Sequence, residues 1–494
     1  MNKDKIRTII TQDAEVDDQN SLRHFLLYAN EVELLGIVQT SSVYHWIGVP
    51  GAATLEQKDL MGRTQIFDCS CANRWTGTDW MFRVLDDYEK VYPNLKRIDP
   101  EYPSPSYLRS ITKIGNIGYP GEVEKATEGS ELIRKAILDE DPRTLYLQVW
   151  GGCNTIARAL SDIQDEFADT VAWGPLHERI SQKVVITACG EQDNAYDNYI
   201  AQEWPEIPFV RCLQMGSYAY AWSHMPEGES KDTLRAAFMK ENLLNRKGAL
   251  MDGYAVWLDG KVYEGEGPEN QFGSNPEILD CWWGGKIGLG PYEEGDFLSE
   301  GDSPTYFLLL NWGLRSLENF SYGGFSGRYV KDESRCSRKG EPLNYWIPQQ
   351  DLYTDRGGNT QLTDSMWRYV ADIQHDFAAR ADWCAADEGD EIEKAPALTV
   401  RGGVDRTARP GDTVRIGYAA KAGFGEDIAV SARIYEEAST VAGAPVPEND
   451  DEAGFLVRIP ADAWPGQSLH VILQARNAKG HRLTHYQQVI VTIV

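Results

Sequence analysis

The sequence predicts an α/β protein: a mostly parallel sheet flanked by helices, followed by a small β-sandwich. Strand and helix patterns alternate through the first half of the chain, which is typical of parallel sheets covered by helices. After residue 396 the pattern changes to short alternating strands without a helical period. A chain of 494 residues is too long to fold around one ordinary core. Its composition, 42% hydrophobic and 11% aromatic residues, is sufficient to form more than one buried core.

The first domain, expected over residues 1–386, opens with an apolar strand at 7–12. A helix is expected next, because Leu22, Phe25 and Leu26 recur at helical spacing. The remaining alternation predicts strands at 32–39, 145–150 and 184–188, and helices at 21–30, 131–138, 155–163 and 304–318. Ligands of such sheets bind at the carboxyl ends of the strands, so we look for chemistry there.

The second domain, expected over residues 397–494, follows an acidic linker at 387–396. Pro410–Gly411 and Pro465–Gly466 mark turns between its alternating segments. These features predict an immunoglobulin-like β-sandwich. Its strands are expected at 413–418, 428–435, 469–475 and 488–494.

The net charge of −27 excludes several classes of partner. Such a surface repels nucleic-acid phosphates and anionic lipid, so we expect neither a nucleic-acid nor a membrane partner. No apolar run reaches the roughly 20 residues that span a bilayer. No leader peptide is visible, which predicts a cytoplasmic chain or a secreted one whose signal peptide is absent from this sequence. The eight scattered cysteines are expected to be buried free thiols.

The densest acidic segment lies between the first strand and the first helix and contains Asp13, Glu15, Asp17 and Asp18. Carboxylates this close repel one another, and a hard divalent cation would remove that cost. Simple capping of the helix by Asp17 or Asp18 explains the segment equally well. The informative feature is the spacing DxxxDD at this point of the fold.

Other segments offer weaker candidates, each with a purely structural alternative. Asp302 precedes the helix expected at 304–318, where it could bind a ligand or cap the helix. The glycines of segment 149–155 allow a ligand to approach the backbone, or form a tight turn. His45 and Trp46 follow the second strand, and we expect them either to face a pocket or to pack in a core.

Together these segments resemble the nucleoside hydrolase superfamily, whose motif DxDPGxDD binds calcium and ribose. Asp13, Asp17 and Asp18 match the last three aspartates of the motif, and Asp302 matches the aspartate of the family's His-Asp pair. The chain is more similar to one branch, the DUF1593 or Sde182-like family of cellulose-binding proteins. The strings DAEVDDQNSLRHFLLYANE, SYLRSITKIGNIG, LYLQVWGGCNTIARAL and EGDSP carry that likeness.

The resemblance implies a site for calcium and sugar. It assigns Asp13, Asp18, Asp302 and the main-chain carbonyl of Trp150 to calcium, and Asp13 also to the general base. Asp17, Asp302 and Asn198 would hold sugar hydroxyls, and His45 and Trp46 would border the sugar. Nucleoside hydrolases commonly form dimers or tetramers, so a homo-oligomer is compatible with the resemblance.

Three departures from true nucleoside hydrolases narrow this expectation. Thr11 replaces the first aspartate, Ala14 and Glu15 replace Pro-Gly, and Gly301 replaces the histidine that helps a nucleobase leave. The resemblance therefore implies a calcium-dependent glycoside hydrolase acting on a furanoside or related glycosidic bond. The resemblance assigns no general acid, and Glu15 and His45 are candidates by position alone. The alternatives are a non-catalytic carbohydrate-binding protein that uses this site and the sandwich, and a structural calcium site.

Overall fold

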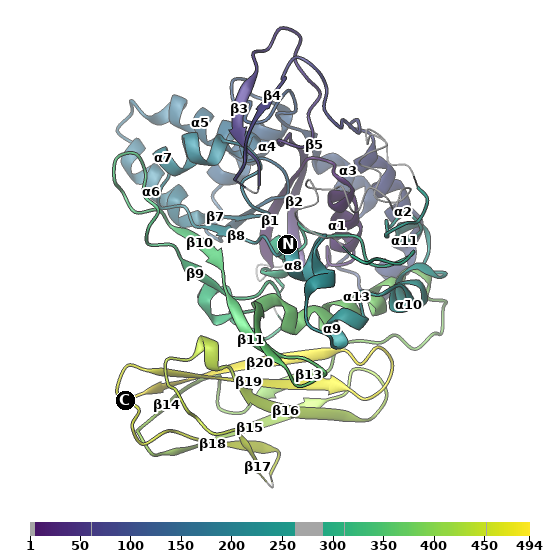
Figure 1. Ribbon diagram of the computed structural model, residues 1–494, viewed down its shortest axis with the longest axis vertical. Coiled ribbons are helices and arrows are strands. Elements are labelled where there is room, and N and C mark those ends of the chain that lie inside the picture. The colour runs from purple at the N-terminus through teal and green to yellow at the C-terminus, as the bar shows by residue number, and fades with distance from the viewer. Residues whose placement is uncertain (1–4, 61, 262–289, 311, 451) are drawn as a thin grey trace.

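The computed structural model describes residues 5–60, 62–261, 290–310, 312–450 and 452–494. An eight-stranded sheet in the order β5-β2-β1-β6-β7-β8-β10-β9 forms the centre of the first domain (Figure 1). Every neighbouring pair is parallel except β10 and β9, so the predicted parallel sheet is confirmed. Its strands are β1 (Ile6–Gln12), β2 (Val32–Gln39), β5 (Thr112–Ile114), β6 (Leu145–Val149), β7 (Val184–Ala188), β8 (Phe209–Arg211), β9 (Tyr329–Lys331) and β10 (Tyr345–Pro348).

Helices cover both faces of this sheet. They are α1 (Val16–Leu26), α2 (Trp80–Ile98), α3 (Pro105–Ile111), α4 (Glu128–Leu138), α5 (Asn154–Phe167), α6 (Trp173–Lys183), α7 (Ala201–Glu203), α8 (Met215–Tyr218), α9 (Glu229–Asp232), α10 (Ala236–Met239), α11 (Ala249–Asp252), α12 (Pro304–Phe307) and α13 (Val370–Ala385). Two hairpins lie outside the sheet: β3 (Leu55–Lys58) with β4 (Thr64–Phe67), and β11 (Gln350–Thr354) with β12 (Thr360–Asp364).

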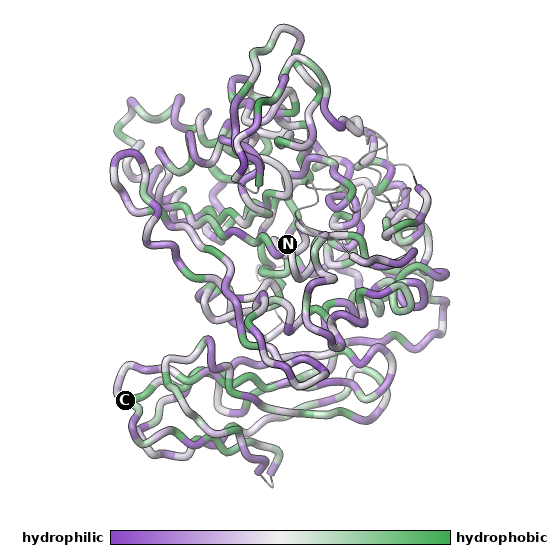
Figure 2. Tube along the Cα trace, in the orientation of Figure 1, coloured by the Kyte–Doolittle hydropathy of each residue, from purple (hydrophilic) through white to green (hydrophobic). Residues whose placement is uncertain are grey.

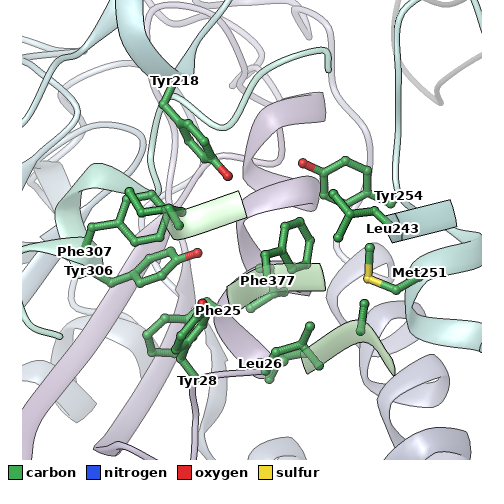
Figure 3. Close-up of a cluster of buried hydrophobic side chains, with 14 of the residues drawn as sticks. Phe25, Leu26, Tyr28, Tyr218, Leu243, Met251, Tyr254, Tyr306, Phe307 and Phe377 are labelled. Carbon is green, nitrogen blue, oxygen red and sulfur yellow. The ribbon is translucent and has the colours of Figure 1, made fainter. Parts of the chain in front are cut away.

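Successive residues of β1 point to opposite faces of the sheet and join different cores. Ile9 packs with α4, α5 and α6, whereas Ile10 packs with α1, α2 and α13. The second core is rich in aromatic rings (Figure 3), among them Phe25, Tyr306 and Phe377. This double burial explains why the strands of the sheet are almost continuously apolar.

Two expected helices differ in extent from those observed. Helix α1 begins at Val16 rather than at residue 21, so Asp17 and Asp18 lie in its first turn. Helix α12 ends at Phe307, and the expected continuation to residue 318 is wrong. Gly313 adopts φ +87°, and a side chain there would collide with the main-chain carbonyl of Tyr486. Because the backbone at Gly313 passes this close to Tyr486, the chain turns there, and the sequence pattern that indicated a helix is not followed.

The second domain consists of two four-stranded sheets, β13-β15-β18-β17 and β14-β20-β19-β16, which confirms the sandwich. Their strands are β13 (Ala397–Val400), β14 (Asp405–Ala408), β15 (Thr413–Lys421), β16 (Ile428–Ile434), β17 (Glu448–Asp450), β18 (Gly454–Arg458), β19 (Ser468–Asn477) and β20 (Thr484–Ile493). Along these strands hydrophobic and hydrophilic residues alternate (Figure 2), and the hydrophobic ones fill the space between the sheets.

The sandwich is joined to the first domain through a shared interface beside α13. Tyr435, Ile472 and Tyr486 of the sandwich belong to the same buried core as α1, α2 and α13. Asp372 of α13 accepts a hydrogen bond from the Tyr486 hydroxyl and pairs with Arg476. The two domains are therefore packed together over apolar and polar contacts.

The residues expected to form a linker also pack against their surroundings. The Glu393 carboxylate accepts a hydrogen bond from the backbone N–H of His481 at 2.7 Å, and its carbonyl accepts one from the Trp383 indole at 3.1 Å. Among the described cysteines five are buried and none forms a disulfide, whereas Cys71 and Cys336 are exposed. Cys281 lies outside the described residues. Within the described ranges no helix has the length and apolar character needed to cross a bilayer.

Candidate functional site

The candidate site lies where the carboxyl ends of β1, β6 and β7 meet. Asp13 follows β1, Trp150 follows β6 and Cys189 follows β7. Asp302 reaches the same place from the segment before α12. Neighbouring parallel strands end at one edge of the sheet, which is why residues so far apart in the sequence come together.

Three carboxylates form what we call the acidic cluster: Asp17, Asp18 and Asp302. One oxygen of each lies within 4.8 Å of the corresponding oxygens of the other two, and all three residues are buried. The Ser299 hydroxyl donates to Asp17 Oδ2 at 3.2 Å. Asp302 Oδ2 is buried without a hydrogen-bond partner. Three acidic groups thus share a small volume without a basic side chain among them.

Burial and mutual repulsion oppose ionisation of the acidic cluster. Burial, followed by the charges of Glu15 and Asp13, raises the pKa of Asp17 to about 8. Burial, with the neighbouring aspartates, also raises the pKa of Asp18 and of Asp302 well above the usual value. A bound cation would reverse this preference, because it favours the charged form of each carboxylate.

Asp13 borders the acidic cluster but has the opposite electrostatic character. Its backbone N–H donates to Asp18 Oδ1 at 3.0 Å, and its own Oδ2 lies 3.8 Å from His45 Nδ1. Burial disfavours the charged form of Asp13, yet the neighbouring His45 ring lowers the pKa of Asp13 below the usual value. Of the four aspartates at the site, Asp13 is thus the one whose pKa is lowered rather than raised.

The loop between β1 and α1 explains how these groups are positioned. Ala14 adopts φ +77°, a conformation that is rare for a residue with a side chain and is found mainly where structure or function demands it. Helix α1 starts after Glu15, which makes no side-chain capping bond. Asp17 and Asp18 lie within the first turn, so neither acts as the N-cap, and the capping interpretation is wrong for this helix.

The Trp150 carbonyl, expected as a calcium ligand, accepts a hydrogen bond from Gln192 Nε2. The indole N–H donates to Thr305 Oγ1 at 2.8 Å, which fixes the ring beneath the site. Gln192, Ser299 and Cys189 were not predicted from the sequence. They come from segments with no local motif, so only the fold brings them to this place.

Gly301 faces the acidic cluster at the position of the missing histidine. A β-carbon there would lie 3.1 Å from Asp17 Oδ2 and 3.6 Å from both Ala219 Cβ and Cys189 Sγ. The space is therefore bordered by a carboxylate, a methyl group and a thiol. None of these supplies the imidazole that would protonate a leaving base.

The other predicted site residues lie at different distances from this centre. His45 is buried beside Asp13, as described above. Trp46 packs edge-on against Phe67 in a small core, and its indole donates to the Cys71 carbonyl at 2.8 Å. Asn198 is exposed and accepts a hydrogen bond from Arg338 at 2.9 Å. The structure thus brings His45 to Asp13, beside the acidic cluster, and places Trp46 and Asn198 outside the cluster.

The donor set of the site fits a hard divalent cation. All of its candidate ligands are oxygens, and two of them, Asp13 Oδ2 and Asp302 Oδ2, are buried without hydrogen-bond partners. Calcium prefers carboxylate and carbonyl oxygens in shells of six to eight, and water molecules can complete such a shell. Beside this donor set lies Asp13, a carboxylate with a lowered pKa.

Comparison with solved structures agrees with the fold of the chain. A solved nucleoside hydrolase-related protein from Saccharophagus degradans, described as associated with carbohydrate metabolism, is 23% identical with a TM-score of 0.69. The similarity covers 99% of this chain and 100% of that one, and it shows a common fold. The effector protein XOO4466 gives a TM-score of only 0.35 at 10% identity, over 77% of this chain and 94% of that one. No curated protein matches the chain.

Family profiles match both domains. Residues 424–493 match the C-terminal domain of the cellulose-binding protein Sde0182. Residues 7–329 match the family described as cellulose-binding Sde182, nucleoside hydrolase-like domain, and they include every residue of the acidic cluster. Because that match covers well over half of the sequence, the chain belongs to the Sde182 nucleoside hydrolase-like family.

Proposed function

We propose that this protein is a calcium-dependent glycoside hydrolase that acts on a furanoside or a related glycosidic bond. One observation carries the proposal: a buried cluster of three aspartates without a basic partner lies beside Asp13, whose pKa is lowered. A structural core rarely keeps uncompensated carboxylates, because the repulsion among them is costly. The arrangement suits a site that takes up its positive charge from solution.

The chain's own residues supply the remaining chemistry. Asp13 accepts the proton of the attacking water as general base, and the nearby His45 ring keeps it ionised. Asp17 and Asp302 accept hydrogen bonds from sugar hydroxyls and so orient the anomeric carbon. A bound calcium ion supplies the charge that makes nearby water more acidic. Attack on the anomeric carbon as the bond to the leaving group breaks gives inversion.

The leaving-group side of the site limits the substrate class. Gly301 provides no acid for a departing nucleobase, so we propose a carbohydrate glycoside rather than a nucleoside. Of the two candidate general acids, His45 is buried next to Asp13, whereas Glu15 pairs with Arg74 at 3.3 Å. Inversion requires the acid on the face opposite Asp13, so neither residue is positioned as the general acid, and the leaving-group oxygen takes its proton from solvent water.

A carbohydrate-binding protein without catalysis is the second candidate function. The same glycine favours it, because a site that lacks a leaving-group acid can still hold a sugar through calcium. The family's description as cellulose-binding agrees with this alternative. In that case the acidic cluster would bind sugar without turnover.

Turnover of aryl furanosides, aryl pyranosides and nucleosides, measured with calcium and with EDTA, tests the proposal. The Asp13→Asn variant should lose about 10²–10⁴-fold in kcat, the usual contribution of a general base. The exposed Asp169→Asn change is the matched control and should leave kcat unaltered. Calcium-dependent sugar binding without turnover would favour the binding function, and absence of calcium binding at millimolar concentration would refute both.

A further inference from the structure

A cavity of about 850 Å³ lies near the acidic cluster. None of the three aspartates of the cluster lines this cavity. The β3–β4 hairpin forms one wall and the segments after β7 and β8 form the others. Side chains on these walls include Lys58, Leu60, Glu191, Asp193, Asn198 and Arg211. Its volume falls in the range of about 300–1,000 Å³ that is usual for small-molecule sites.

The charged groups of this cavity are compensated by the protein itself. Glu191 pairs with Arg211 at 3.0 Å and with Arg335 at 2.9 Å, and Asp197 pairs with Arg335 at 2.6 Å. Asp193 accepts backbone N–H groups at 2.9 and 3.0 Å, although burial still raises its pKa to about 6. The walls are thus strongly polar, but these carboxylates do not need a bound cation.

Two consecutive glycines separate the cavity from the acidic site. A β-carbon on Gly151 would lie 2.7 Å from Asp13 Cβ, and one on Gly152 would collide with Asp193 Oδ2. Asp13 and Asp193 therefore pack against neighbouring positions of one turn. A ligand in the cavity would lie beside the acidic site without displacing a group from it.

We infer that this cavity is a binding site for a neutral polyhydroxylated ligand, a short oligosaccharide segment. Hydroxyl groups both donate and accept hydrogen bonds, and the walls offer acceptors on Glu191 and Asp193 and donors on Lys58 and Arg211. An apolar ligand would displace water from these polar walls without replacing the hydrogen bonds of that water. An anionic ligand would meet a wall with more carboxylates than basic groups. The inference goes beyond the proposed function, because it requires neither turnover nor calcium.

Calorimetric titration of the full chain with cellotetraose, maltotetraose and xylotetraose in EDTA tests this site. The combined variant Asn198→Ala and Lys58→Ala removes one polar group from each of two walls and should weaken binding at least tenfold. Gln202→Ala is the matched control. Gln202 lies one turn after Asn198, also accepts a hydrogen bond from Arg338, and does not line the cavity. Melting curves would verify that each variant is folded.

The outcomes separate this inference from the proposed function. Binding in EDTA that survives Asp18→Asn and Gln202→Ala but is weakened in the double variant supports the cavity as the site. Binding that requires calcium and is insensitive to the double variant assigns the saccharide to the acidic cluster and overturns the inference. Failure of all three tetrasaccharides to bind at millimolar concentration, or binding of spermidine in their place, overturns it as well.

Discussion

Two buried groups of carboxylates in the first domain differ in how their charge is balanced. At the first, Arg380 of α13 pairs with Asp376 at 2.6 Å and with Glu31, and it lies over the Tyr28 ring at 4.0 Å. The Tyr28 hydroxyl donates to the same Asp376 oxygen at 2.7 Å. At the second, the acidic cluster, no basic side chain pairs with any of the three aspartates among the described residues.

We propose that this difference separates a structural role from a functional one. Arg380 satisfies its acidic partners within the chain and also donates to the Leu27 carbonyl at 2.8 Å, which ties α13 to the end of α1. The acidic cluster keeps raised pKa values because its neighbours are negative. A buried carboxylate with a basic partner is compensated within the chain, whereas one with only acidic neighbours has a raised pKa. The presence of a basic partner, rather than the depth of burial, determines which outcome follows.

The largest expected effect comes from breaking the compensated group. Replacing Arg380 by methionine should lower the free energy of unfolding by about 3–5 kcal/mol, because buried Asp376 loses its partner. Chemical denaturation measures this change. Arg458→Met is the control, since Arg458 pairs with Glu448 at the surface and should cost under about 1 kcal/mol. Equal losses in the two variants would contradict the distinction.

Calcium should have an effect of intermediate size on the uncompensated group. At a calcium concentration 100 times Kd, binding should raise the free energy of unfolding by about 2.7 kcal/mol. Asp302→Asn should remove most of this gain, because it deletes one of the three carboxylates. Thermal unfolding with calcium and with EDTA measures both values. A gain of the same size in wild type and variant would mean that calcium binds elsewhere.

The smallest expected effect is a dependence of stability on pH. In EDTA the folded state binds more protons than the unfolded state between about pH 4 and 8, because the pKa of Asp17 is raised to about 8. Stability from this group is therefore present at low pH and is lost as the pH rises through 8. Between pH 7 and 8, wild type should lose roughly 1 kcal/mol more than Asp17→Asn. Parallel curves for the two proteins would refute the raised pKa.

Much of the architecture could be predicted because local patterns and burial agree. Strands β2 and β7 have the predicted bounds, since both are apolar on both faces and end at polar or glycine-containing turns. The start of α1 was placed too late because its first turn, at residues 16–19, is largely polar in sequence. That turn carries Asp17 and Asp18, two of the three aspartates of the acidic cluster, so the polar residues that obscure the helix start in the sequence also contribute to the site.

The site could be predicted only in part. Asp13, Asp17 and Asp18 are close in sequence, and Asp302 was identified through the family motif. Gln192 could not be predicted, because its contact with the Trp150 carbonyl depends on how the turn after β7 folds back. Asn198 was expected beside the sugar, but a π-helical turn at Tyr196–Ile200 places it on the wall of the neighbouring cavity.

The shared core beside α13 limits how the chain could lose or exchange its C-terminal domain during evolution. Tyr435, Ile472 and Tyr486 complete a core that begins in the first domain, and the side-chain partners of Asp372 among the described residues lie on the sandwich. A chain truncated before the sandwich would expose an apolar face of the first domain and leave the Asp372 carboxylate without these partners. The sandwich therefore completes the interior of the first domain and is not a detachable module.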